Sequence, residues 1–380
     1  MKVLKRKILV SFLLILLLGL FGCTIEARYK SEFSQLDATS IEHELKFGGA
    51  YIHITIEDFN KLGFEYGDSV DVYFSSGFEL IDLPYYNGYY VDTGDPLLVA
   101  YPGYPYIKTC YNNGDDMFIV GGLSEDDTAV ITIHEKAKYL NMQEAMDIHY
   151  SDEQGTQSDE VFANFRVVNV GNLRPNILYR SASPCDNQHQ RAGVSDRLAE
   201  AAGIRCIMNL SDNEEELIEH INGFDFDSPY FLSLYQENLV IPLSMSMAYK
   251  TEVFSEKLLS GLAFIASHDG PYLVHGVEGK DRTGFVCIIL EALAGASYDE
   301  LVADYMETYD NYYGVNLIDQ YEKYMIIKHK NFDPMIDYLF GGEVGLDNYQ
   351  SLVEEFLLGI GMSEEVLISL ENKLCADCSY

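Results

Sequence analysis

Tyr272-Leu-Val-His-Gly-Val-Glu-Gly-Lys-Asp-Arg-Thr-Gly284 decides the fold, because this stretch joins a buried strand, a tight loop and a helix start within thirteen residues. Its first residues form a short apolar run that ends at His275. From Gly284 onward the sequence is apolar on nearly every side, which is typical of a helix packed in the centre of a domain. A strand, a loop and a helix in this order predict an α/β fold.

The loop between this strand and this helix is a candidate anion-binding site. We expect its successive backbone N–H groups to surround one oxyanion, and the helix to present the positive end of its dipole to the same point. Arg282 adds a planar guanidinium that can bind two oxygens at once. Together these features predict a phosphate-monoester site. The predicted phosphate-binding residues are Val277, Glu278, Gly279, Lys280, Asp281 and Arg282.

The residues from His275 to Gly284 resemble the signature of the cysteine-dependent tyrosine phosphatases, in the bacterial group that reads His-Cys-x-x-Gly-Lys-Asp-Arg-Thr-Gly. The specified positions match except the second, where Gly276 replaces the nucleophilic cysteine. The resemblance implies a cysteine-phosphatase-like α/β fold, with a mainly parallel sheet flanked by helices.

The same resemblance implies a role for the loop residues. By motif position the catalytic residues are Asp281, which would protonate the leaving oxygen, and Arg282, which would hold the phosphoryl oxygens. Lys280 would add charge for further phosphate groups, and His275 and Thr283 would support the loop. No metal or cofactor is implied. Two plainer interpretations stay open, in which His275 is a hydrogen-bonded core histidine and Lys280-Asp281-Arg282 is an ion-paired loop.

Gly276 has no atom that can attack phosphorus, so the sequence predicts impaired catalysis. The leading hypothesis is a pseudophosphatase that recognises a phosphorylated protein or small molecule without turning it over. One alternative is an active phosphoprotein or phosphoinositide phosphatase that uses another nucleophile, for instance water activated by Asp281. Cys287 is not expected to replace the missing thiol, because five residues beyond Arg282 it should lie in the helix.

Two earlier stretches, Asn164-Phe-Arg166 and Tyr179-Arg180-Ser181, resemble the opening of the same family. Where the family expects Asp-Leu-Arg, this chain has Asn209-Leu-Ser211, so a polar support of the site is altered. These stretches define a tyrosine-phosphatase-like domain at 161–380 with a helical C-terminal part. Tyrosines spaced along a predicted helix at 298–313 are expected to line a substrate groove or to pack in the core.

The N-terminus predicts export. Residues 1–22 begin with a basic stretch, continue with an apolar run too short for a confident membrane span, and form a predicted signal peptide. The run ends at Cys23, in a context that resembles the lipobox of bacterial lipoproteins, in which this cysteine carries the lipid. The protein is therefore expected outside the cytoplasm, lipid-anchored to the bacterial cell membrane. An uncleaved anchor helix is the alternative.

A polar tether at 23–40, a small β-domain at 41–140 and a linker at 141–160 are predicted before the phosphatase-like domain. Short alternating strands separated by turn residues, such as the strand predicted at 51–56, indicate a barrel-like β-domain. It faintly resembles the C-terminal domain of hydroxide adenosyltransferases, which implies fold only. Its tyrosine-rich middle predicts either an aromatic binding face or half-buried packing, and the former supports a third hypothesis, adhesion or envelope binding.

The charge of the chain narrows the classes of partner. It has 25 basic and 60 acidic residues and a formal net charge of −35. Nucleic acid is excluded as an expected partner, because binding to its phosphate backbone requires a positive surface. Such a chain also repels polyanions, except where Lys280 and Arg282 reverse the local field.

Overall fold

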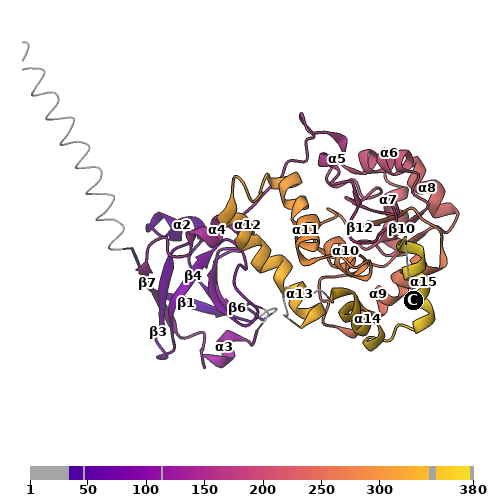
Figure 1. Ribbon diagram of the computed structural model, residues 1–380. Helices are drawn as coiled ribbons and strands as arrows, with labels where there is room; N and C mark the ends of the chain where they lie inside the picture. Colours follow the sequence, from indigo (N-terminus) through magenta and orange to yellow (C-terminus); the bar gives the residue numbers. More distant parts are fainter. Residues whose placement is uncertain (1–33, 46–47, 113, 342–347, 377–380) are drawn as a thin grey trace, which may run out of the picture. The chain divides into compact units, whose positions relative to one another are not determined.

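The computed structural model describes residues 34–45, 48–112, 114–341 and 348–376. The chain divides between Ile148 and His149 into two compact units (Figure 1). The predicted signal peptide and Cys23 lie outside the described residues.

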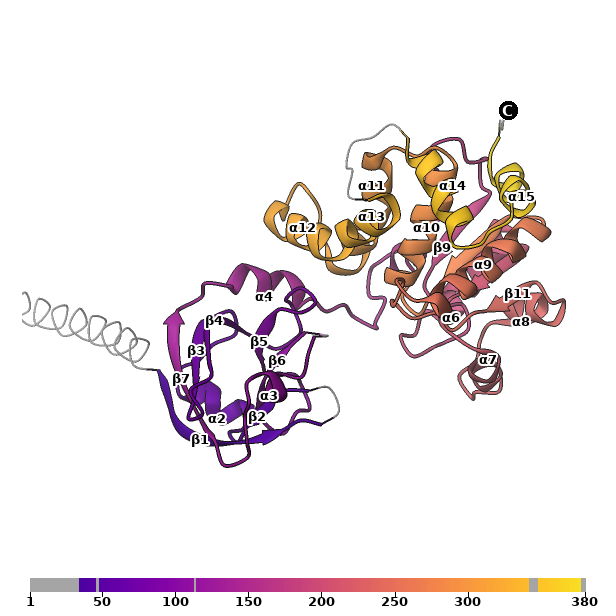
Figure 2. The same ribbon diagram turned by 90° about the horizontal axis from the view of Figure 1, so that it is seen from below.

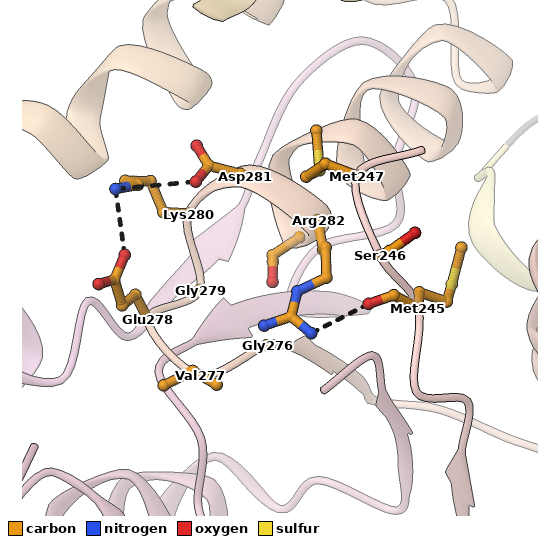
Figure 3. A pocket seen from close by; sticks show the side chains of 11 residues that line it. Met245, Ser246, Met247, Gly276, Val277, Glu278, Gly279, Lys280, Asp281 and Arg282 are labelled. Atoms are coloured by element: carbon orange, nitrogen blue, oxygen red, sulfur yellow. Dashed lines mark hydrogen bonds and ion pairs between the residues drawn. The ribbon is translucent and has the colours of Figure 1, made fainter. Parts of the chain in front are cut away.

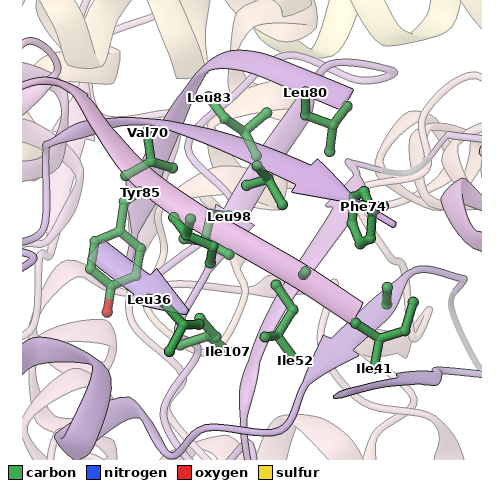
Figure 4. Packing of buried hydrophobic residues seen from close by; sticks show 14 of the residues in the cluster. Leu36, Ile41, Ile52, Val70, Phe74, Leu80, Leu83, Tyr85, Leu98 and Ile107 are labelled. Carbon is green, nitrogen blue, oxygen red and sulfur yellow. The ribbon is translucent and has the colours of Figure 1, made fainter. Parts of the chain in front are cut away.

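The first unit is a closed barrel of seven strands in the order β1-β2-β6-β5-β4-β3-β7 (Figure 2). Alternate side chains along each strand point inward, as the two-residue period of a strand requires. Val70, Leu98 and Ile107 from three different strands meet in this interior (Figure 4). The strands are β1 (Gln35–His43), β2 (Ala50–Ile52), β3 (Ser69–Phe74), β4 (Glu79–Tyr86), β5 (Pro96–Val99), β6 (Ile107–Tyr111) and β7 (Thr128–Glu135), and the helices are α2 (Ile56–Lys61), α3 (Met117–Val120) and α4 (Leu140–Met146).

Two boundaries differ from the sequence expectation. Strand β1 begins at Gln35, so part of the predicted tether belongs to the barrel. Most residues of this strand are polar and face outward, so the few that point inward, such as Leu36 and Ile41, did not stand out as a strand pattern in the sequence. The strand predicted over 51–56 ends at Ile52, because Thr55 accepts a hydrogen bond from the amide of Asp58 and starts α2.

The tyrosine-rich middle of the barrel is largely packed. Tyr85 and Tyr86 are buried, and the Tyr85 hydroxyl lies 2.6 Å from Asn60 Oδ1. Tyr89 and Tyr104 share a hydrogen bond of 2.8 Å between their hydroxyls. Tyr101, by contrast with Tyr85 and Tyr86, is 45% exposed. These contacts favour half-buried packing over an open aromatic face.

The second unit contains a five-stranded sheet in the order β11-β10-β12-β9-β8. The pairings β11 with β10, β10 with β12 and β12 with β9 are parallel, and β8 is an antiparallel edge strand. The sheet is therefore mainly parallel, and β12 lies at its centre. The strands are β8 (Arg166–Val168), β9 (Leu178–Ser181), β10 (Cys206–Asn209), β11 (Val240–Pro242) and β12 (Tyr272–His275).

Helices cover both faces of this sheet, as a parallel sheet requires. Leu273 of β12 packs in one cluster with Leu217 of α7 and Phe231 of α8. On the opposite face the side chain of Met208 lies against Gly261 of α9. The helices are α5 (Asp159–Phe162), α6 (Ala192–Ala202), α7 (Glu214–Ile221), α8 (Pro229–Gln236), α9 (Glu252–Ser267), α10 (Asp281–Leu293), α11 (Tyr298–Tyr313), α12 (Tyr321–Ile327), the π-helix η1 (Lys328–Phe332), α13 (Asp333–Phe340), α14 (Tyr349–Gly359) and α15 (Glu364–Leu374).

Helix α10 is the central helix that the sequence predicts, because every residue from Thr283 to Leu293 is buried. Helix α11 has the predicted bounds, 298–313. Across the described ranges, no helix is both long enough and apolar enough to span a membrane.

Candidate phosphate site

The loop that joins β12 to α10 forms the floor of a cavity of about 390 Å³ (Figure 3). Residues 276–283 line one side, and Met245, Ser246 and Met247, which follow β11, line the other. The cavity thus opens at the carboxyl end of the central parallel strand, where α/β sheets bind ligands.

Backbone donors are concentrated in this loop. Within the described residues, no carbonyl or side chain accepts a hydrogen bond from the amides of Val277, Glu278, Gly279 and Lys280. The first turn of α10 adds N–H groups that have no partner inside the helix. A group of amide donors at the start of a helix suits an anion.

Gly276 leaves the floor of the cavity open. A Cβ built at this position would lie 3.4 Å from Thr283 Oγ1 and 3.7 Å from Arg282 Nε, both ordinary contacts. Gly279 differs, since it has a φ of +67° and its Cβ would lie 2.1 Å from the Ser181 carbonyl oxygen. The backbone therefore requires glycine at 279 and admits a side chain at 276.

Two buried polar atoms beside Gly276 have no hydrogen-bond partner among the described residues, Thr283 Oγ1 and His275 Nε2. The Thr283 hydroxyl points toward the open position. His275 lies with Nδ1 3.2 Å from the Gly276 carbonyl oxygen. Burial lowers the pKa of His275 to about 4, although the Asp212 carboxylate opposes the shift. His275 is thus a neutral imidazole at physiological pH.

Arg282 is positioned by backbone carbonyls. Its Nη1 donates to Met245 O at 3.0 Å and to Leu210 O at 3.4 Å. In the described part of the chain no carboxylate forms an ion pair with Arg282. The guanidinium is therefore held over the cavity and its charge is not compensated by an acidic side chain.

Lys280 lies differently, because acidic side chains of the same loop pair with it (Figure 3). Its Nζ is 3.1 Å from Glu278 Oε2 and 3.7 Å from Asp281 Oδ2. Burial lowers the pKa of Lys280, but Asp281, Tyr309 and Glu278 together leave that pKa raised well above its usual value. The loop is thus ion-paired at Lys280 and unpaired at Arg282.

The two earlier motifs hold the loop from behind. The Asn164 amide donates to Glu278 O at 3.3 Å and to Gly279 O at 3.2 Å. Fully buried Arg180 donates to Gly279 O at 2.9 Å and also bonds Asp304 of α11. Arg166 donates to Asp304 Oδ1 at 3.0 Å. Sequence reasoning identified the two motifs but missed their shared acidic partner, since nothing marks Asp304 among the many acids of α11.

The stretch Asn209-Leu-Ser211 also supports the site, although its residues differ from the family pattern. The Asn209 amide donates to Asp212 Oδ2 at 2.8 Å, and the Leu210 amide donates to His275 O at 2.9 Å. Leu210 O in turn accepts from Arg282. The Asn209 side chain thus bonds a residue just beyond the end of its own strand, and the backbone of Leu210 accepts a hydrogen bond from the Arg282 guanidinium.

The tyrosines of α11 pack behind the loop. Tyr312 donates to Glu278 O at 2.7 Å, and Tyr313 lies 3.4 Å from Lys280 Nζ. Tyr305 lies 3.5 Å from Asp281 Oδ1. None of the residues that line the cavity is a tyrosine. These side chains fix the loop residues, and the groove interpretation finds no support in the lining.

Neither Cys287 nor Cys185 is placed as a substitute nucleophile. Cys287 is buried in α10, as predicted, and burial raises the pKa of its thiol. Cys185 is also buried, and burial together with Asp212 raises its pKa. Neither thiol lines the cavity. In the described ranges, no group of three or more His, Cys, Asp or Glu side chains is arranged to hold a metal ion.

Comparison with known proteins gives a family match. A family model described as the tyrosine phosphatase family matches residues 162–374. No curated protein matches the chain. One solved structure, of an uncharacterized conserved protein from Thermotoga maritima, has 22% sequence identity and a TM-score of 0.23, and the match covers 26% of this chain and 36% of that one.

Proposed function

The chain belongs to the tyrosine phosphatase family, and we propose that it is a cell-surface lipoprotein that binds phosphate monoesters and has lost most of the family's hydrolytic activity. The observation that carries the proposal is the open position at Gly276, at the start of a loop whose backbone donors remain.

Binding is supported by the donors around the cavity. The oxygens of a phosphate group placed at the loop would meet the free amides, the Arg282 guanidinium and the unpartnered Thr283 hydroxyl. Hydrogen bonds to a charged group contribute about 1.5–3 kcal/mol each. A dianion also meets no thiolate charge in this loop, which favours its binding relative to a cysteine enzyme.

Loss of turnover follows from the missing nucleophile. In a cysteine enzyme the thiolate attacks phosphorus to form a covalent intermediate, and an acid protonates the leaving oxygen. Asp281 lines the cavity and can supply the proton, but Gly276 supplies no attacking atom. Removing a nucleophile costs on the order of a millionfold in rate in a well-studied hydrolase, and binding and electrostatics account for the remainder.

Phosphate release from an aryl phosphate tests this proposal in the wild type and in Gly276→Cys. We expect no release above background from the wild type. The cysteine variant should gain orders of magnitude, because its Cβ fits and the loop amides and Thr283 can stabilise a thiolate. Gly276→Ala is the control without a nucleophile. Turnover by the wild type that Asp281→Asn abolishes would instead support water as the nucleophile.

Calorimetry tests the binding half of the proposal. Wild type should bind a phosphotyrosine peptide or inorganic phosphate, and Arg282→Ala should lose that binding, since it removes the uncompensated charge. Arg282→Lys keeps the charge without the planar fork and should bind with intermediate affinity. A wild type that binds no phosphorylated ligand at millimolar concentration would contradict the proposal.

A further inference from the structure

Lys280 is the second cation of the phosphate loop, and the loop itself already supplies it with anions. Its Nζ lies 3.1 Å from Glu278 Oε2 and 3.7 Å from Asp281 Oδ2. It also lies 3.4 Å from the Tyr313 hydroxyl. The side chain extends toward Glu278 and not toward Arg282 (Figure 3). In this arrangement the ammonium group already has partners, so it contributes little charge or hydrogen bonding to a ligand in the cavity.

Glu278 is itself held in place from the other side. The Tyr150 hydroxyl donates to Glu278 Oε1 at 2.6 Å, so each carboxylate oxygen has a separate partner. The Tyr150 ring stacks on Tyr312 at a centroid distance of 4.9 Å, and the Arg191 guanidinium lies 4.7 Å from the same ring. Moving Glu278 away from Lys280 would therefore disturb a packed cluster, and not merely rotate one surface side chain.

The charges of the loop match a single phosphate group. Glu278 and Asp281 together offset Lys280, while Arg282 is bonded to carbonyl oxygens. A second phosphate group on the same ligand would have to displace Glu278 from Lys280 or lie beside the Glu278 carboxylate. Like charges in contact weaken binding, and the acidic chain as a whole repels polyanions.

We propose that Glu278 is a specificity-determining residue that occupies Lys280 in the place of a second phosphate group. The site then selects ligands with one phosphoryl group and disfavours ligands with two neighbouring ones. This proposal rests on the proposed function, since it concerns which phosphate monoesters the site accepts.

Titration calorimetry with myo-inositol monophosphate and a vicinal myo-inositol bisphosphate tests the proposal on the full chain. Wild type should bind the bisphosphate no more tightly than the monophosphate. Glu278→Gln keeps the side-chain shape and removes the nearer of the two carboxylates that pair with Lys280. It should therefore raise the affinity for the bisphosphate by at least about tenfold and that for the monophosphate by much less. Thermal unfolding of each variant checks that the loop variants are folded.

Lys280→Met provides the matched control, in wild type and combined with Glu278→Gln. Alone it leaves the Glu278 and Asp281 carboxylates without their cation, so it should not raise the affinity for the bisphosphate relative to the monophosphate. In the double variant it should abolish the gain. If wild type prefers the bisphosphate and Lys280→Met removes that preference, the proposed role of Glu278 would be overturned, whereas the phosphate site itself would stand. Failure of the wild type to bind either ligand or inorganic phosphate would overturn the phosphate site as well.

Discussion

Gly276 and Gly279 lie three residues apart in one loop but differ in what their backbones demand. Position 276 has space for a Cβ. Position 279 has a φ of +67°, and a Cβ there would lie only 2.1 Å from the Ser181 carbonyl oxygen. We expect Gly276→Ala to stabilise the fold by about 0.4–1 kcal/mol through the unfolded chain. Gly279→Ala should destabilise it by more than about 2 kcal/mol. Denaturant unfolding of the two variants measures this contrast, and equal effects would contradict it.

His275 makes folding sensitive to acid. Its pKa falls from an ordinary value near 6.5 to about 4 in the folded chain. The unfolded state therefore takes up a proton first as the pH falls, so stability is full above pH 6.5 and is lost between there and about pH 4. The loss is on the order of 3 kcal/mol.

Unfolding of wild type and His275→Gln across this range measures the contribution of His275. The glutamine variant should lack this part of the pH dependence, and any slope left in it belongs to other groups. Identical slopes in the two proteins would show that His275 is not the titrating group.

At the scale of elements, the segment from β12 through the loop to α10 could be predicted, and so could α11. These elements were predictable because each is an apolar or periodic run bounded by clear turn or cap residues. Strand β4 could not, because Pro84 and Asp82, which has a φ of 60°, interrupt its pattern. Within the site, the loop residues were predicted, while Tyr150 and Asp304 were missed because distant segments bring them to it.

The buried carboxylate of Asp304 joins β8, β9 and α11. Burial raises the pKa of Asp304, but Arg166 and Arg180 outweigh it and hold that pKa below its usual range. Asp304→Asn leaves the buried Arg180 guanidinium without its paired carboxylate and leaves Arg166, among the described residues, with only the half-exposed Glu307, which should cost about 3–5 kcal/mol. Glu307→Gln is the control, since Glu307 is 51% exposed and lies 3.6 Å from Arg166; it should cost less than about 1 kcal/mol. Comparable losses in the two variants would contradict this account.

At the scale of the whole molecule, attachment to the membrane is proposed to depend on Cys23, which lies outside the described residues. We expect Cys23→Ser to move the globular part from the membrane fraction to the soluble fraction, because stable anchoring needs more than one acyl chain and this cysteine would carry them. Cell fractionation with mass measurement checks the expectation. Retention of the variant in the membrane at unchanged mass would support an uncleaved anchor helix.

The open floor at Gly276 also bears on how this protein could change. Glycine codons that end in a pyrimidine differ from cysteine codons by one nucleotide, and a Cβ at this position displaces no neighbour. Where the codon for Gly276 ends in a pyrimidine, a single point mutation would place a cysteine here, and the backbone leaves room for its Cβ. The retained Arg282, Thr283 and loop amides would then make phosphate recognition, and not turnover, the trait that the loop still serves.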